Sequence, residues 1–272
     1  MAGLRNREAL DALRARIAGL ENRPAFAEAA SLSSRPEDLL AAPPGLLHEV
    51  FTPERRNAGS SLGFALGQAR GLLSEKRPAL IILQLANDAS DIGLPYGAGL
   101  AHFGIDPDAV VIGRIETIPE LLWALEEAVG CRAVAAVIAD VSGHPKALDF
   151  TASRRLSMRA AASRTSIFFL RYGRDRESSA AQLRWRLTPA ISRETVFDAR
   201  APAGPRFHLT LEKGRLGAAH TASAGLGFTL DWTRDGFVVV DNSREGGEER
   251  VPLAAAPGAA PAALGDRLSK AG

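Results

Sequence analysis

Short apolar runs alternate with helical segments from residue 46 to residue 172, and this alternation restricts the possible folds more than any other feature. Each run is bounded by Gly, Pro or charged residues and is rich in Ile and Val, as buried parallel strands are. The runs cover 46–51, 79–85, 109–115, 133–141 and 166–172. The intervening helices are predicted at 60–74, 94–103, 118–129 and 149–163. Such units predict an α/β fold with a mainly parallel central sheet flanked by helices.

After residue 180 the apolar period changes from helical to two. Apolar and polar side chains alternate in 183–187, 207–211 and 228–232. This pattern is typical of half-buried antiparallel strands. We therefore expect an antiparallel C-terminal extension of the sheet.

The segments outside this core have a different composition. Residues 1–45 contain a predicted amphipathic helix followed by a linker rich in Ser, Pro and Gly. The apolar stripe of that helix consists of Leu10, Leu13, Ile17 and Leu20. We favour packing of the stripe on the chain's own core over a partner-binding role. Residues 46–245 form the predicted core domain, and residues 246–272 form a tail of Ala, Pro and Gly that we expect to be mobile.

The composition excludes several classes of protein. The 272 residues are 46% hydrophobic and contain no apolar run of membrane-spanning length, so we expect no membrane span. No secretory signal is visible, which predicts a cytoplasmic location. The single cysteine, Cys131, rules out an internal disulfide and a thiolate zinc site. The five histidines lack metal-binding spacing, so no metal site is predicted.

The segment between the first predicted strand and helix lies where a phosphate-binding P-loop would lie. Gly59, Ser60 and Ser61 align with the end of the G-x-x-x-x-G-K-[ST] motif, but Ser60 replaces the lysine that meets the β- and γ-phosphates. Asp140 ends an apolar strand, as the magnesium-binding Asp of a Walker B strand does. These four residues indicate a degenerate nucleotide site. We expect very weak hydrolysis and no obligatory cofactor, although an anion could still bind at the helix N-terminus.

GSSLG at residues 59–63 also matches the nucleophile elbow of serine hydrolases, with Ser61 as the nucleophile. Asp140 followed by His144, His208 or His220 would supply the usual order of the triad. The nine residues TPERRNAGS separate the first strand from Ser61, whereas an elbow follows its strand directly. This hypothesis is therefore the weaker enzymatic alternative.

Charge is distributed unevenly along a chain whose net charge is only +2. Residues 75–150 carry five basic and 11 acidic side chains, whereas residues 151–195 carry ten Arg and three acidic side chains, a net +7. A basic segment of this kind indicates either a solvated face or a surface for nucleic acid or an acidic protein. The candidate DNA-binding residues are Arg154, Arg155, Arg159, Arg164, Arg184 and Arg186.

Several of these segments, taken in order, resemble the ImuA family, the RecA-like accessory proteins of bacterial mutagenic DNA repair cassettes. The resemblance covers roughly residues 46–240. It rests on GLLHEVF, on the segment from LPYGAGLAHFG through LLWALEEAV to IADV, and on LDFTASRRLSMRAAASRTSIFFLR, AAQLRWRLTPA and PRFHLTLEKGR.

The resemblance implies a RecA-like core that has lost the ATP chemistry of the recombinase. The strand ILQLAND agrees, since it offers no Glu where a catalytic carboxylate would be expected. It also implies a non-catalytic adaptor in damage-induced (SOS) translesion DNA synthesis. The implied partners are an ImuB-like polymerase homologue and an error-prone replicative-type DNA polymerase, with RecA and DNA as further candidates. A P-loop-type nucleotide hydrolase is the alternative.

Overall fold

The structure, a computed structural model, describes residues 40, 43–195, 198, 200–214 and 227–240. The predicted N-terminal helix, the tail after residue 246 and His220 lie outside these residues. Within the described part, none of the helices combines the length and apolar character needed to cross a bilayer.

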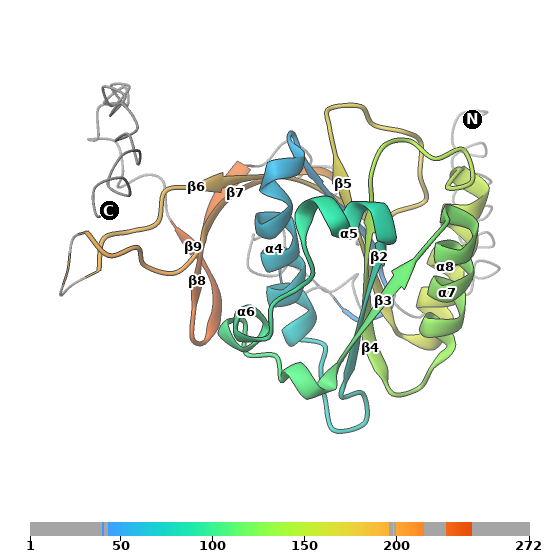
Figure 1. Ribbon diagram of the computed structural model, residues 1–272, viewed down its shortest axis with the longest axis horizontal. Helices are drawn as coiled ribbons and strands as arrows, with labels where there is room; N and C mark the ends of the chain where they lie inside the picture. The colour runs from blue at the N-terminus through green and yellow to red at the C-terminus, as the bar shows by residue number, and fades with distance from the viewer. Residues whose placement is uncertain (1–39, 41–42, 196–197, 199, 215–226, 241–272) are drawn as a thin grey trace, which may run out of the picture. The chain divides into compact units, whose positions relative to one another are not determined.

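The described residues form one nine-stranded sheet in the order β3-β2-β4-β5-β1-β6-β7-β8-β9 (Figure 1). The strands are β1 (Leu47–Thr52), β2 (Ala79–Leu85), β3 (Val110–Ile115), β4 (Val134–Val141), β5 (Ser166–Tyr172), β6 (Leu183–Ala190), β7 (Arg206–Gly214), β8 (Gly227–Thr233) and β9 (Gly236–Val240). β1 to β5 are parallel, as predicted. Every residue of β1, β4 and β5 is buried, which is why these strands read as continuous apolar runs.

The C-terminal strands confirm the antiparallel extension with one correction. β7, β8 and β9 are antiparallel to their neighbours, but β6 runs parallel to β1, with Val50 opposite Trp185. The alternation of apolar residues in β6 is the same whichever way its neighbour runs. The prediction therefore placed β6 correctly in the sheet but gave its direction wrongly on the β1 side.

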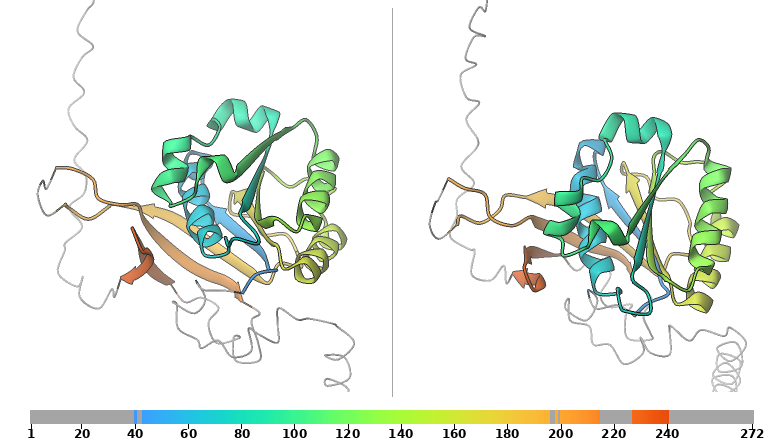
Figure 2. Two further views of the ribbon diagram at one scale, coloured as in Figure 1. Left: turned by 90° about the horizontal axis from the view of Figure 1, so that it is seen from below. Right: turned by 60° about the horizontal axis from the view of Figure 1, so that its bottom comes forward.

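Helices cover both faces of the parallel part of the sheet (Figures 1 and 2). They are α4 (Ala58–Arg70), α5 (Ala86–Ile92), α6 (Gly97–His102), α7 (Ile118–Gly130) and α8 (Phe150–Ser163), with short 3-10 turns η1 (Arg55–Asn57) and η2 (Pro107–Ala109). α7 begins at a capping box, in which the Thr117 side chain accepts from the Glu120 N–H and the Glu120 carboxylate accepts from the Thr117 N–H.

Two apolar clusters hold these layers together. On one face, α4 packs on the sheet through Phe64, whose ring meets Trp185 of β6 and Phe237 of β9. Gly67 permits this contact, because a Cβ at that position would lie 2.5 Å from the Phe237 ring. On the other face, α7 and α8 bury Leu121 and Leu156 against the sheet. α4 is therefore fixed to both the parallel and the antiparallel strands.

Candidate functional site at the carboxyl ends of the parallel strands

Polar side chains collect where the carboxyl ends of the parallel strands meet, which is the edge where α/β folds place their ligand sites. Gln84, near the end of β2, lies beside Asp140, near the end of β4, in the register of the sheet. Both side chains line a cavity of about 190 Å³. Gly59 of α4 lines the same cavity, and Ser60 and Ser61 follow it in the first turn of the helix. The four predicted residues are thus brought to one edge of the sheet.

The segment that was expected to resemble a phosphate loop has another structure. β1 ends at Thr52 and α4 begins at Ala58, so Gly59 lies inside the helix rather than in a glycine-rich loop. The prediction started this helix two residues too late. Arg55 of the intervening turn forms an ion pair with Asp88 of α5, with 2.5 Å between Nη2 and Oδ1, and a longer one of 3.4 Å with Asp91. The cation nearest this site is therefore already held by carboxylates.

Ser61 does not have the geometry of a nucleophile elbow. It lies within α4, its side chain is fully buried, and its hydroxyl has no hydrogen-bond partner among the described residues. An elbow serine instead stands exposed on a sharp turn directly after its strand. His208 contacts Thr229 on the antiparallel strands, with 2.9 Å between Nδ1 and Oγ1, and His144 contacts Glu177.

Asp140 is the most perturbed acid of the site. Burial raises its pKa to about 6, and the charge of Asp88 acts in the same direction. The nearby Tyr172 and Gln84 side chains and the Arg55 charge oppose this shift. Burial, followed by the charge of Asp140, also raises the pKa of Tyr172. Asp140 therefore gains a proton at a higher pH than an exposed Asp does.

Unpartnered polar atoms are concentrated at this edge of the sheet. Buried side chains normally have hydrogen-bond partners, so a group of exceptions marks a place that requires explanation. Among the described residues, the atoms without a partner include Thr52 Oγ1, Ser61 Oγ, Gln84 Oε1, Asp88 Oδ2, Asp140 Oδ1 and Tyr172 OH. Together with the cavity, these atoms make the carboxyl edge the candidate functional site.

The candidate DNA-binding arginines are divided between α8 and β6. On α8, Arg155 and Arg159 both pair with Glu126 of α7, at 2.5 and 3.3 Å. Arg154 of the same helix is exposed, with no ion pair found in the part of the chain that the structure describes. Arg164 is the C-cap of α8 and has a left-handed backbone, with φ of 58°. The basic charge of α8 is therefore partly neutralised.

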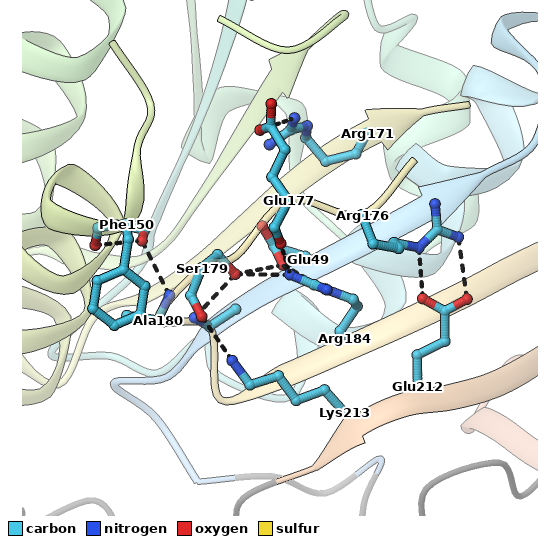
Figure 3. A network of polar contacts seen from close by, with 12 residues as sticks. Glu49, Phe150, Arg171, Arg176, Glu177, Ser179, Ala180, Arg184, Glu212 and Lys213 are labelled. Carbon is cyan, nitrogen blue, oxygen red and sulfur yellow. Dashed lines mark hydrogen bonds and ion pairs between the residues drawn. The ribbon is translucent and has the colours of Figure 1, made fainter. Parts of the chain in front are cut away.

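The two arginines of β6 have different surroundings. Arg184 forms a buried ion pair with Glu49 of β1, whereas Arg186 is more exposed and lies 3.7 Å from Glu212. Arg184 also donates to the Glu177 carbonyl and the Ser179 hydroxyl of the segment that follows β5 (Figure 3). Its primary role is thus internal, which the count of charges along the sequence did not reveal.

Residues 173–182, which we call the β5–β6 crossing, are held on the sheet by basic side chains (Figure 3). Arg176 of the crossing donates to both carboxylate oxygens of Glu212, and Lys213 donates to the Ser179 carbonyl at 2.7 Å. Arg176 also stacks on the Phe51 ring, with 3.9 Å from Cζ to the centroid. Of the candidate DNA-binding residues, Arg184 is the one whose printed contacts hold this crossing, together with Arg176 of the crossing itself and Lys213 of β7.

No family model matches the sequence, and no curated protein is significantly similar to it. The site therefore has to be interpreted from its geometry.

Four polar residues of this edge were not predicted from the sequence: Arg55, Gln84, Asp88 and Tyr172. Gln84 carries a recognisable signal, because it is a polar residue near the carboxyl end of an apolar run. Arg55 and Asp88 carry none, since their pairing depends on segments 33 residues apart in the chain.

Proposed function

We propose that this protein is a non-catalytic accessory protein of damage-induced mutagenic translesion DNA synthesis, built on a RecA-like core without a working phosphate loop. It acts with an ImuB-like polymerase homologue and an error-prone replicative-type DNA polymerase, and RecA and DNA are further candidate partners. The basis in sequence is the ordered set of segments that resembles the ImuA family.

The observation that carries the non-catalytic part of the proposal is the ion pair between Arg55 and Asp88. A nucleotide hydrolase needs backbone N–H groups and a cation directed at the β- and γ-phosphates. Here the residues after β1 form a 3-10 turn, and the Arg55 guanidinium is bound to the Asp88 carboxylate instead. The mainly parallel sheet supports the RecA-like core, since its carboxyl edge gathers the residues of the degenerate site.

Association with the products of neighbouring genes tests the adaptor role. Purified full-length protein is expected to retain the ImuB-like protein in a pull-down, through the stripe of Leu10, Leu13, Ile17 and Leu20 or through residues 246–272. Deletions of 1–20 and of 246–272, separately and together, assign the contribution of each segment. Persistence of binding after both deletions would place the interface on the core.

A genetic measurement tests the pathway itself. Deletion of the gene is expected to reduce damage-induced mutation frequency to the uninduced level, and a plasmid copy restores it. Unchanged mutation frequency, together with failure to retain the ImuB-like protein, would contradict the proposal.

A further inference from the structure

Two side chains that line the cavity at the carboxyl ends of β2 and β4, Gln84 and Asp140, each carry a buried hydrogen-bond acceptor without a partner among the described residues. Asp140 Oδ1 and Gln84 Oε1 are both unpartnered among the described residues, and their side chains are only 2% and 4% exposed. They stand on adjacent strands in register, and neighbouring strands are about 4.8 Å apart. One group that carries two or more N–H donors can therefore reach both oxygens.

The charge around the cavity has the opposite sign from that of a phosphate site. Arg55 is already paired with Asp88 and Asp91, whereas Asp140 has no ion pair within the described part of the chain. The N-terminus of α4 contributes the equivalent of about half a positive charge near Gly59, which is less than the full charge of an ionised Asp140. The excess charge is negative, so the cavity is complementary to a cation.

The side chains that line the cavity indicate which kind of cation fits it. Apolar side chains such as Leu62, Ile82, Ile138 and Leu170 surround the two acceptors, which suits a cation on an aliphatic stem. The described residues contain no group of three or more His, Cys, Asp or Glu side chains that could hold a metal ion. An organic cation with N–H donors meets both conditions.

We propose that this cavity binds a guanidinium or ammonium group, hydrogen-bonded to Asp140 and Gln84. The group comes either from a free small amine or from an Arg or Lys side chain of a partner protein. This assignment is separate from the adaptor role. It concerns a ligand of opposite charge from the nucleotide that the degenerate motif first suggested.

Titration with small cations, followed by the backbone amide NMR signals of the full-length protein, tests the proposal. Methylguanidinium and n-butylammonium are expected to shift the signals of Gly59, Gln84 and Asp140. Tetramethylammonium has the same charge but no N–H donor, and it is expected to leave these signals unchanged. Inorganic phosphate and ATP are negatively charged and test whether the cavity binds an anion instead.

Two variants locate the binding site, and a third is the matched control. Asp140→Asn and Gln84→Met each remove one acceptor, and Asp140→Asn is expected to weaken methylguanidinium binding at least about tenfold. Glu127→Gln removes a charge from an exposed position of α7 and is expected to have no effect. Thermal unfolding of each variant confirms that it is folded.

The pH dependence provides a second readout. Binding is expected to weaken as Asp140 becomes protonated, so affinity at pH 5 is lower than at pH 7.5. The other groups that face Asp140 are Arg55, Gln84, Asp88 and Tyr172. Asp140→Asn is expected to remove most of this dependence.

A blocked Gly-Arg-Gly peptide distinguishes the two sources of the cation. Binding of the peptide more tightly than methylguanidinium identifies a partner's side chain, and weaker binding of the peptide identifies a free amine. Absence of any shift with either cation at saturating concentration would overturn the proposal. Stronger shifts of the same signals with phosphate or ATP would overturn it as well.

Discussion

Glu49 of β1 and Arg184 of β6 form a buried ion pair, with 2.7 Å between Oε2 and Nη2, across the last parallel strand pair before the antiparallel extension that begins with β7. The side chains are only 4% and 12% exposed. Ser179 of the β5–β6 crossing adds a hydrogen bond to the same carboxylate oxygen at 2.8 Å. One carboxylate thus connects both strands and the crossing.

Removal of one partner of this pair is expected to destabilise the fold strongly. Glu49→Met leaves the Arg184 charge buried without its partner, which costs about 3–5 kcal/mol of unfolding free energy. The double variant Glu49→Met with Arg184→Met is expected to lose less than the sum of the single variants. Urea unfolding measures each value. Arg186→Met, two residues along β6 at a more exposed ion pair, is the control and is expected to cost less than about 1 kcal/mol. A double variant whose loss of unfolding free energy equals the sum of the two single variants would contradict the coupling between Glu49 and Arg184.

Asp140 is expected to make stability depend on pH. Its pKa is raised from 3.8 to about 6 in the folded protein, so the folded state holds the proton more tightly than the unfolded chain. Its stabilising contribution is therefore complete below about pH 4 and is lost as the pH rises through about 6. Asp140→Asn is expected to be more stable than the unmodified protein by up to about 3 kcal/mol at pH 8, and unchanged at pH 4.

The measurement for Asp140 is urea unfolding of both proteins between pH 4 and pH 8. Glu127→Gln is the control, because its exposed side chain lies on α7. A constant difference between the Asp140→Asn and unmodified proteins at every pH would contradict the assignment.

No ATP hydrolysis above background is expected, even with magnesium and DNA present. Ser60 supplies no cation for the β- and γ-phosphates, and Arg55 is held by Asp88. Phosphate release by the purified protein is the measurement. Sustained turnover that is abolished by Asp140→Asn or by altering Gly59 would favour the nucleotide-hydrolase alternative.

DNA association through α8 is expected to be limited by Glu126. Its carboxylate pairs with Arg155 and Arg159, so phosphates must compete with it for both guanidinium groups. Arg155→Ala with Arg159→Ala is expected to reduce the salt slope of binding by up to about two units, equally for unrelated sequences. Glu126→Gln is expected to strengthen binding.

Fluorescence anisotropy with duplex DNA over a range of salt concentrations measures both effects. Arg114→Ala on the edge strand β3 is the control for general loss of positive charge. Failure of the unmodified protein to bind DNA at about 50 mM salt would rule out direct phosphate contact.

The strands of the parallel sheet were largely predictable from the sequence. β2 and β5 have the predicted bounds, 79–85 and 166–172. β9 was missed, although Asp235 and Gly236 form the type of dipeptide that joins hairpin strands. α5 was missed for another reason. Its seven residues, ANDASDI, have no apolar stripe at helical spacing.

The site was predictable in place but not in chemistry. Gly59 and Asp140 could be assigned to the carboxyl edge because a parallel sheet brings successive strand ends together. The ion pairs of Arg55 and Arg184 could not, since they join segments that only the tertiary fold brings into contact. The charge count treated Arg184 as positive charge available to a partner, whereas in the structure its guanidinium pairs with the buried Glu49.

The position of β1 in the sheet has a consequence for synthesis of the protein on the ribosome. β1 lies between β5 and β6; Leu47 pairs with Ile167 of β5, and Glu49 contacts Arg184 of β6, which is 135 residues further along the chain. At translation rates of about 5–20 residues per second, roughly ten seconds separate the emergence of β1 from that of its neighbours. During that interval the six residues of this strand, all buried in the finished fold, remain without strand partners. The newly made chain therefore has a defined period in which chaperone binding competes with aggregation.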